Sequence, residues 1–193
     1  MGPLFLSLFG GFSPPFTLVR APAPVIQSVI KLGAKVDEGR IVVAISLPWF
    51  EIVREIERDP NFLYKVDWHT MEQLVAGAYH RNGWNVTLTP RGKNDGGRDV
   101  IATRPDFGSI RIVDQIKTYK PGRLVEPADV DAMLGVLNKD AGVTKGFVTT
   151  TAEFSPSIFQ DADVRRFMPN RLTLKNGAEL RDWLVRSEKA TGV

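Results

Sequence analysis

Apolar side chains recur along this chain with two different periods, and each period predicts a type of element. The β-branched run at residues 40–47 (RIVVAISL) predicts a buried strand. Pro48 suits the first turn of the helix that follows, which we expect to end before Asp59 and Pro60. The preceding residues 1–24 are interrupted by glycines and prolines, which indicates irregular or extended chain.

The middle and the end of the chain alternate between strand and helix patterns. Met71, Leu74 and Val75 begin an apolar stripe along a helix predicted over residues 67–82. Strands are predicted at residues 84–89, 98–103, 109–117, 145–151 and 171–174, with a turn at residues 105–108, and helices at residues 128–138 and 178–186. A hairpin followed by a helical crossover to another strand predicts an α/β fold, in which helices flank a central mixed β-sheet.

This order divides the chain into two parts. Residues 1–60 are expected to form an N-terminal extension, made of a proline-rich arm, one strand and one helix, and residues 61–193 to form the larger domain. The apolar start, PLFLSLFGGF, is shorter than the roughly 20 residues that cross a bilayer and has no positively charged segment before it. We therefore expect no membrane segment, a cytoplasmic protein, and an arm that packs on its own subunit or on another one.

Composition narrows the chemistry that the chain can perform. Its 193 residues are 43% hydrophobic and 24% charged, as in ordinary folded domains, and include no cysteine and two histidines. A disulfide framework, a Cys-ligated zinc and a thiol nucleophile are excluded, so any metal is expected to be a hard cation bound by oxygen, Mg²⁺ or alternatively Mn²⁺. The net charge of +3 permits nucleic-acid binding without requiring it.

Two short segments carry polar residues that suit a reactive site: DGGRDVIA at residues 95–102 and VDQIKTY at residues 113–119. Side chains alternate along a strand, so Gln115 and Lys117 share one face. Taken alone, the second segment is typical of an edge strand with one solvated face. The first is typical of a turn, in which glycines allow a sharp bend before Asp99.

On adjacent strands, the two segments together predict hydrolysis of a phosphodiester. That reaction needs an activated water and neutralisation of the charge on the transition state. A metal held by Asp99, by the side-chain oxygen of Gln115 and by the backbone carbonyl of Ile116 would supply both. Lys117 would orient the water, act as its base or stabilise the developing charge, and the sequence leaves these roles open.

A single carboxylate makes a weak Mg²⁺ site, and further acids are candidates for a second ligand. Glu72 lies on the helix before the sheet among apolar neighbours, with a solvated helix charge as the alternative. Asp95 is either another ligand or a turn-forming residue. Asp114 points away from Gln115 and is expected to be structural.

Five segments, in this order, resemble the Mrr-type restriction endonuclease domain of the PD-(D/E)XK nuclease superfamily: EQLVAGAYHRNGWNVTLTP, DGGRDVIA, DQIKTY, KGFVTTTAEF and RLTLKNGAELRDWL. Each segment is unspecific alone, whereas the ordered set, which covers about residues 67–185, is specific. The resemblance implies a restriction-endonuclease-like core. It also implies a Mg²⁺-dependent endonuclease that cuts double-stranded DNA in restriction or in defence against foreign DNA.

Carried over by position, Asp99 matches the metal-binding aspartate of the superfamily, and Gln115 and Lys117 match its last motif in a Q-x-K form. Glu72 matches the acidic residue of the first core helix. Arg98 stands where the superfamily name has proline, and Gln115 stands where most members have a carboxylate. Both departures are usual in the Mrr-like branch, but an uncharged ligand implies a lower metal affinity or a site that depends on Glu72.

Basic residues surround the two segments and are expected to contact DNA phosphates, which gives an affinity that depends on salt rather than on sequence. They are Arg91, Lys93, Arg98, Lys120 and Arg123, with scattered solvated charge as the alternative. Cutting both strands with one site per chain would suggest a homodimer. Two other functions fit the residues: a non-catalytic DNA-binding or assembly module on the same fold, and a junction or repair nuclease.

Overall fold

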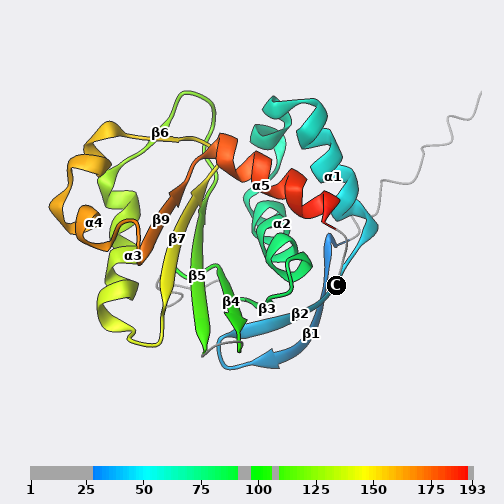
Figure 1. Ribbon diagram of the computed structural model, residues 1–193. Coiled ribbons are helices and arrows are strands. Elements are labelled where there is room, and N and C mark those ends of the chain that lie inside the picture. The colour runs from blue at the N-terminus through cyan, green and yellow to red at the C-terminus, as the bar shows by residue number, and fades with distance from the viewer. Residues whose placement is uncertain (1–27, 91–96, 106–108, 191–193) are drawn as a thin grey trace, which may run out of the picture.

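The computed structural model describes residues 28–90, 97–105 and 109–190, and within these ranges seven strands form one sheet (Figure 1). In spatial order the strands are β1 (Ile30–Val36), β2 (Gly39–Ile45), β3 (Asn85–Leu88), β4 (Val100–Arg104), β5 (Ile110–Lys117), β7 (Lys145–Thr150) and β9 (Leu172–Lys175). The short strands β6 (Leu124–Val125) and β8 (Glu153–Phe154) pair in parallel apart from this sheet.

The sheet is mixed, which confirms the predicted fold class. Neighbouring strands from β1 to β5 are antiparallel, whereas β5, β7 and β9 are parallel. A helical crossover joins β5 to β7, as the order of patterns predicts. The helices are α1 (Leu47–Arg58), α2 (Trp68–Arg81), α3 (Pro127–Lys139), α4 (Ala162–Phe167) and α5 (Gly177–Lys189), with 3₁₀ helices η1 (Pro60–Lys65) and η2 (Pro156–Gln160).

Helices cover both faces of the sheet and bury two apolar layers. On one face, Ile112 and Ile116 of β5 pack with apolar residues of α1, α2 and α5. On the other face, Val113 of β5 and Ile101 of β4 pack with α3 and α4. Figure 1 shows α3 and α4 on the opposite side of the sheet from α1 and α2. The period-two alternation of β5 therefore assigns Gln115 and Lys117 to the α3 face.

Local sequence signals explain where α1 begins and where α2 begins and ends. The Asp67 side chain accepts hydrogen bonds from the backbone N–H groups of His69 and Thr70, which caps the start of α2. Gly83 follows the end of α2 with a φ of 80°, a left-handed conformation that favours glycine. Pro48 lies in the first turn of α1. These helices and the predicted strands are confirmed within a few residues.

The structure also contains elements that the sequence patterns did not predict. Strand β1 was missed because Gly33 interrupts its apolar alternation, and its pairing with β2 contains irregularities in register. Helix α4 and the strands β6 and β8 are too short to show a period. The predicted arm at residues 1–24 and residues 106–108 of the predicted turn lie outside the described residues.

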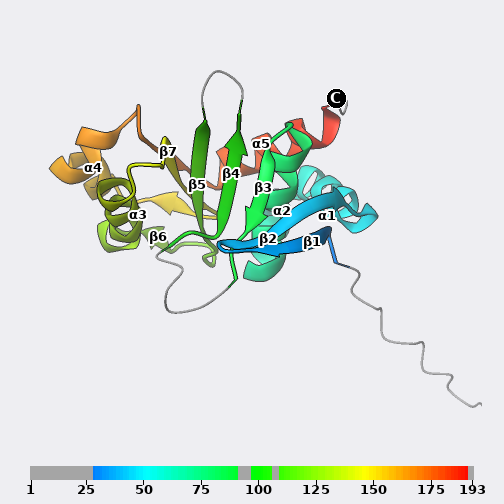
Figure 2. The ribbon, with the colours of Figure 1, turned by 90° about the horizontal axis from the view of Figure 1, so that it is seen from below.

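Residues 30–58 of the predicted extension take part in the main sheet and core. Strand β2 pairs with β3 at Arg40 and Ile41, so the β1–β2 hairpin lengthens the sheet on the side away from α3 and α4 (Figure 2). Trp49 and Ile56 of α1 are fully buried against α2 and its neighbours. The division of the chain at residue 60 stays a prediction.

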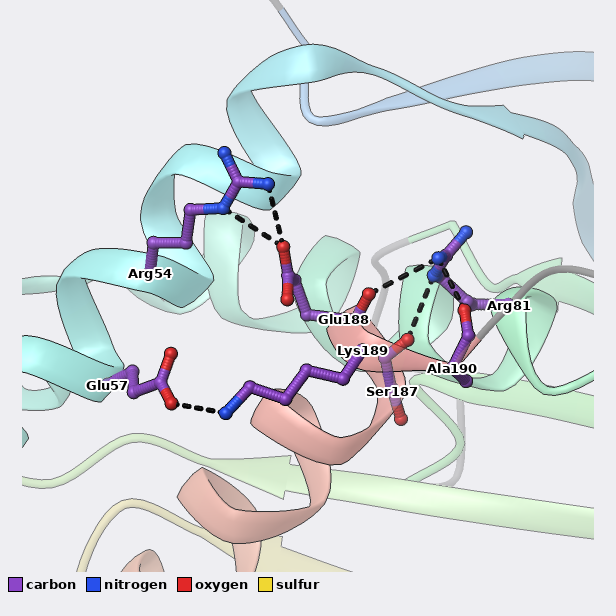
Figure 3. Close-up of polar contacts among 7 residues, drawn as sticks. All are labelled: Arg54, Glu57, Arg81, Ser187, Glu188, Lys189 and Ala190. Carbon is purple, nitrogen blue, oxygen red and sulfur yellow. Dashed lines mark hydrogen bonds and ion pairs between the residues drawn. The ribbon is translucent and has the colours of Figure 1, made fainter.

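The C-terminal helix closes the layer formed by α1 and α2 (Figure 3). Glu188 of α5 forms an ion pair of 2.9 Å with Arg54 of α1. Arg81, at the end of α2, donates hydrogen bonds to the carbonyls of Ser187 and Glu188. None of the helices in the described ranges combines the length and apolar character needed to cross a bilayer.

Candidate active site

The first residue of the candidate site, Asp99, is held against β5 immediately before β4 begins. Val100 pairs with Asp114 in the antiparallel register, and the backbone N–H of Asp99 donates to the carbonyl of Asp114 at 3.0 Å. The Asp99 carboxylate accepts a hydrogen bond of 2.7 Å from the backbone N–H of Ile116. Sheet pairing therefore brings together the two segments that the sequence analysis singled out.

Gln115 is a buried side chain with an acceptor oxygen available. It is 6% exposed, and its Oε1 accepts no hydrogen bond from the residues that the structure describes. Burying a carbonyl oxygen without a donor is unfavourable, and such oxygens usually have a partner. A hard metal cation or its bound water is a partner that suits this oxygen. The arrangement thus fits the predicted role of Gln115 as a neutral oxygen ligand.

Gly97 allows the loop before β4 to approach Gln115 closely. Its φ of 79° is left-handed, and a Cβ atom there would lie 2.8 Å from Gln115 Nε2 and 3.0 Å from the Cβ of Ala132 on α3. A side chain there would be strained by the left-handed backbone and would also require Gln115 or Ala132 to shift. One glycine of the DGGRD segment is therefore required by geometry, with Gln115 on one side of it and α3 on the other.

Lys117 lies half-buried at the end of β5, and its charge acts on the carboxylate of Asp129 in the first turn of α3. Desolvation acts to raise the pKa of Asp129. The hydrogen bonds from Tyr119 and from the backbone of Glu126, together with the charges of Lys117 and Arg123, hold that pKa below its ordinary value. Desolvation and the hydrogen bond to Asp129 raise the pKa of Tyr119 to about 12. Asp129 was not predicted as a residue near the site. Its position three residues after Glu126, which caps the helix, does indicate the first turn of α3.

Glu72 is buried in the first half of α2, with 8% of its surface exposed. A short turn joins α2 to the antiparallel β3, and Thr89 after β3 donates its backbone N–H to the carbonyl of Asp99. The start of α2 therefore lies at the same end of the sheet as Asp99. Within the helix, Glu72 lies 3.9 Å from a ring nitrogen of His69. Its participation with Asp99 and Gln115 in one metal site stays a prediction.

The candidate metal ligands differ in chemical type: a carboxylate, an amide oxygen and a backbone carbonyl. Among the described residues, no group of three or more His, Cys, Asp or Glu side chains is placed to hold a metal ion. The backbone of Ile116 donates to Asp99, and Gln115 and Lys117 are the neighbours of Ile116 on β5. Such a set suits an oxygen-preferring cation with several retained waters, which is the usual coordination of Mg²⁺.

The opposite face of β5 carries a polar cluster of another kind. Asp114 is 0% exposed, and its Oδ2 accepts hydrogen bonds from Tyr79 and Thr149, each at 3.0 Å. Burial raises the pKa of Asp114, against the opposing effect of the Lys175 charge and of the two hydrogen bonds. Asp114 therefore points away from Gln115, in the direction that strand alternation predicts.

Among the basic residues predicted to contact DNA, one is exposed, one lies over an aromatic ring and one is in an ion pair. Lys120 is exposed just beyond β5, and the guanidinium of Arg123 lies 3.9 Å from the centre of the Tyr119 ring. Both residues follow Lys117 in the chain, in the segment after β5. Arg98 instead forms an ion pair of 3.1 Å with Asp140. Arg91 and Lys93 lie outside the described residues.

A known family matches most of the chain. A family model described as a restriction endonuclease matches residues 63–184. A protein of Sinorhizobium fredii (strain NBRC 101917 / NGR234), named "Uncharacterized protein y4cE", is 34% identical over 109 residues. That alignment covers 53% of this chain and 28% of the relative, so the chain spans less than a third of the relative's length.

Three solved structures to which this chain is similar are restriction endonucleases by their titles. The MspJI restriction endonuclease in complex with a 27-mer oligonucleotide has a TM-score of 0.44 and 18% identity, over 72% of this chain and 30% of its own. The DNA modification-dependent restriction endonuclease AspBHI has a TM-score of 0.46 and 15% identity, over 74% and 35%. The restriction endonuclease FokI has a TM-score of 0.48 and 11% identity, over 84% and 37%.

Proposed function

Because this chain belongs to the Mrr-type restriction endonuclease family, we propose that it is a Mg²⁺-dependent endonuclease that hydrolyses the phosphodiester bonds of double-stranded DNA in the cytoplasm. Its biological role would be restriction or defence against foreign DNA. The observation that carries the proposal is the buried Oε1 of Gln115. It accepts no hydrogen bond from the described residues, and the next residue along β5, Ile116, donates its backbone N–H to the Asp99 carboxylate.

The residues present fit a bound Mg²⁺ or Mn²⁺. Asp99 and Gln115 would hold the ion with the carbonyl of Ile116, and Glu72 would provide the second carboxylate. The bound ion would supply a Lewis acid and a water of lowered pKa. The hydrogen bond from the backbone of Ile116 fixes one oxygen of Asp99, so the carboxylate is oriented before any ligand arrives.

Lys117 and the loop after β5 would handle the DNA. The Lys117 ammonium, half-buried at the strand end, would orient the attacking water or stabilise the charge that develops on the phosphate. Lys120 and Arg123, which follow Lys117 in the chain, would bind neighbouring phosphates. Cleavage of both strands would then require two chains, which predicts a homodimer on DNA.

The decisive experiment is cleavage of plasmid DNA by the purified chain in Mg²⁺, in Mn²⁺ and in EDTA. We expect cutting in either metal, none in EDTA, and none by Lys117→Ala, while that variant still binds DNA. Lys35→Ala, on the exposed edge strand β1, is the matched control and should cut normally. DNA left intact in both metals, across unmodified and modified substrates, would refute the enzymatic proposal.

A second candidate is a non-catalytic DNA-binding or assembly module on the same fold. It is favoured by the absence, among the described residues, of a group of three acidic or histidine side chains placed around a metal. Calorimetry separates the two: DNA binding without Mn²⁺ binding supports the module. Preferred cleavage of branched or nicked substrates over linear duplex would instead indicate a junction or repair nuclease.

A further inference from the structure

We infer that Arg98 is a positioning residue that holds Asp99 in place through Asp140, and not a phosphate contact. The inference rests on the proposed function, because its effect is on metal-dependent cleavage. Its basis is the ion pair of 3.1 Å between Arg98 and Asp140, which links the residue before Asp99 to the end of α3.

Each of the three consecutive residues 97–99 contacts β5, α3 or both. Gly97 packs between Gln115 and Ala132 with no room for a side chain. Arg98 reaches Asp140 at the C-terminus of α3. Asp99 accepts the hydrogen bond from the backbone of Ile116. The metal-binding residue thus sits in a short segment braced by β5 on one side and by α3 on the other.

The Arg98 side chain runs along α3 rather than out into solvent. Its side chain is 29% exposed and that of Asp140 is 27% exposed, so the pair is partly shielded from water and salt. Arg98 Nε is buried and has no hydrogen-bond acceptor among the described residues. Beside it is a cavity of about 510 Å³, lined by residues of α3 that include Ala132 and Gly135. Alanine and glycine at these two positions leave space for a long arginine.

Charges around Arg98 favour an internal role. Asp140 caps the C-terminus of α3, where a cation is favourable and an anion is unfavourable, so Arg98 offsets the charge of Asp140. Asp140 is itself oriented by the backbone N–H of Gly142. Nearby, the hydrogen bond from Arg111 lowers the pKa of Glu38, and the charges of Arg111 and Arg98 add to that lowering. Arg98 therefore already has acidic partners inside the protein.

The two roles predict opposite effects of removing Asp140. If Arg98 binds a DNA phosphate, Asp140 competes for it, and Asp140→Asn should strengthen DNA binding. If Arg98 positions Asp99, Asp140→Asn should slow cleavage as Arg98→Ala does and leave DNA affinity unchanged. A phosphate contact also contributes to the salt dependence of binding, and losing it lowers the slope of log K against log salt by about one.

The test measures kcat, KM for duplex DNA, and the DNA dissociation constant at several salt concentrations in Ca²⁺. The variants are Arg98→Ala, Arg98→Lys, Asp140→Asn and the double variant Arg98→Ala/Asp140→Asn. We expect each single loss of charge to lower kcat about ten- to a hundredfold, since small misplacements of reacting groups have effects of that size. KM and the salt slope should not change, Arg98→Lys should recover part of the rate, and the double variant should be no slower than either single one.

Arg54→Ala is the matched control, because Arg54 also forms an ion pair of 2.9 Å between two elements but lies between α1 and α5 (Figure 3). It should retain the kcat of the unmodified protein. Thermal unfolding of every variant shows that the assays are done on folded protein. If Arg98→Ala does not fold, Asp140→Asn carries the test.

The outcomes separate this inference from the proposed function. Unchanged kcat in Asp140→Asn, tighter DNA binding by it, or a lowered salt slope in Arg98→Ala would overturn the positioning role while cleavage by the unmodified protein stands. If the unmodified protein neither cuts DNA nor binds Mn²⁺ by calorimetry, the proposed function fails, and the positioning role falls with it.

Discussion

The two faces of β5 carry neighbouring polar residues with very different surroundings. On one face, Asp114 is fully buried and its Oδ2 accepts hydrogen bonds from Tyr79 and Thr149, with the charge of Lys175 nearby. On the other face, Gln115 is almost as deeply buried, but its Oε1 has no donor among the described residues. Asp114 Oδ1 also has no hydrogen-bond partner among the described residues, so the difference is that one oxygen of this carboxylate has two donors, whereas Gln115 Oε1 has none.

We propose that this difference separates a residue that stabilises the fold from a residue that binds a ligand. Donors around a buried carboxylate offset the cost of its desolvation, and removing them destabilises the protein. For a buried carbonyl oxygen without a donor, no hydrogen bond offsets the free-energy cost of desolvation. The proposal that Gln115 binds a metal explains why the cost is tolerated, and it predicts that the two faces respond differently to mutation.

The largest effect is expected for Gln115→Ala on activity. Loss of the oxygen ligand should lower the DNA cleavage rate on the order of 10³-fold, about 4 kcal/mol in activation free energy. The free energy of unfolding should change by about 1 kcal/mol or less, because Oε1 has no hydrogen bond to lose within the described residues. Gln115→Glu keeps an oxygen ligand and should still cut. Unimpaired cutting by Gln115→Ala would remove the residue from the site.

Asp114→Ala should lower the stability of the protein more than its activity. It leaves Tyr79, Thr149 and Lys175 buried without their acidic partner, so the free energy of unfolding should fall by about 3 kcal/mol. Urea denaturation measures this change. Cleavage per folded molecule should fall less than in Gln115→Ala. A loss of stability below about 1 kcal/mol would mean that the polar cluster is not what stabilises this face.

The pH dependence of stability gives a finer test of the same cluster. Desolvation raises the folded-state pKa of Asp114 above the ordinary 3.8. A raised carboxyl pKa favours the protonated form on folding, so its contribution to stability is complete below pH 3.8 and is lost as the pH rises through the folded-state pKa. The asparagine in Asp114→Asn does not titrate. As the pH rises from 3.8 to the folded-state pKa of Asp114, the free energy of unfolding of this variant should therefore increase relative to that of the unmodified protein, by at most about 1.4 kcal/mol per pH unit.

Urea titrations of both proteins at a series of pH values measure this difference directly. Lys175 and Tyr79, which face Asp114, are common to both proteins. Parallel stability curves for the two proteins would show that Asp114 has no raised pKa in the folded state.

The smallest effect is expected for Tyr79→Phe. The change removes one of two hydrogen bonds to Asp114 and keeps the edge-on ring contact with Trp183, so we expect a loss of about 1 kcal/mol. Thermal or urea unfolding detects a change of that size. A loss as large as that of Asp114→Ala would mean that Tyr79 is the main partner of the carboxylate and that Thr149 adds little.

Much of the fold was predictable from local patterns. The stripe beginning at Met71, Leu74 and Val75 predicted α2, and Asp67 caps that helix. The patterns before and after β5 predicted a hairpin and a helical crossover, and the sheet is mixed for that reason. Strand β1 and helix α4 were not predicted, because one has an interrupted alternation and the other is shorter than two helical turns.

The candidate site was predictable only in part. Alternation assigned Gln115 and Lys117 to one face, and the spacing of the motifs brought Asp99 into consideration. Asp129 was missed because its proximity to Lys117 depends on how α3 docks at the end of β5. Arg98 was expected to contact DNA because a charge in a loop gives no sign of its partner. The partner, Asp140, lies on another element.

The sequence by itself determined the family, the order of strands and helices, and the type of residue available for chemistry. These properties reside in short-range periodicity and in the side chains themselves. Only the tertiary structure decided which of those residues meet: that Asp99 is anchored to β5, that Gln115 is buried without a donor, and that Arg98 is held by α3. The physical reason is that sheet register and helix docking set distances and burial between residues far apart in the chain, and those quantities determine whether a polar atom has a partner.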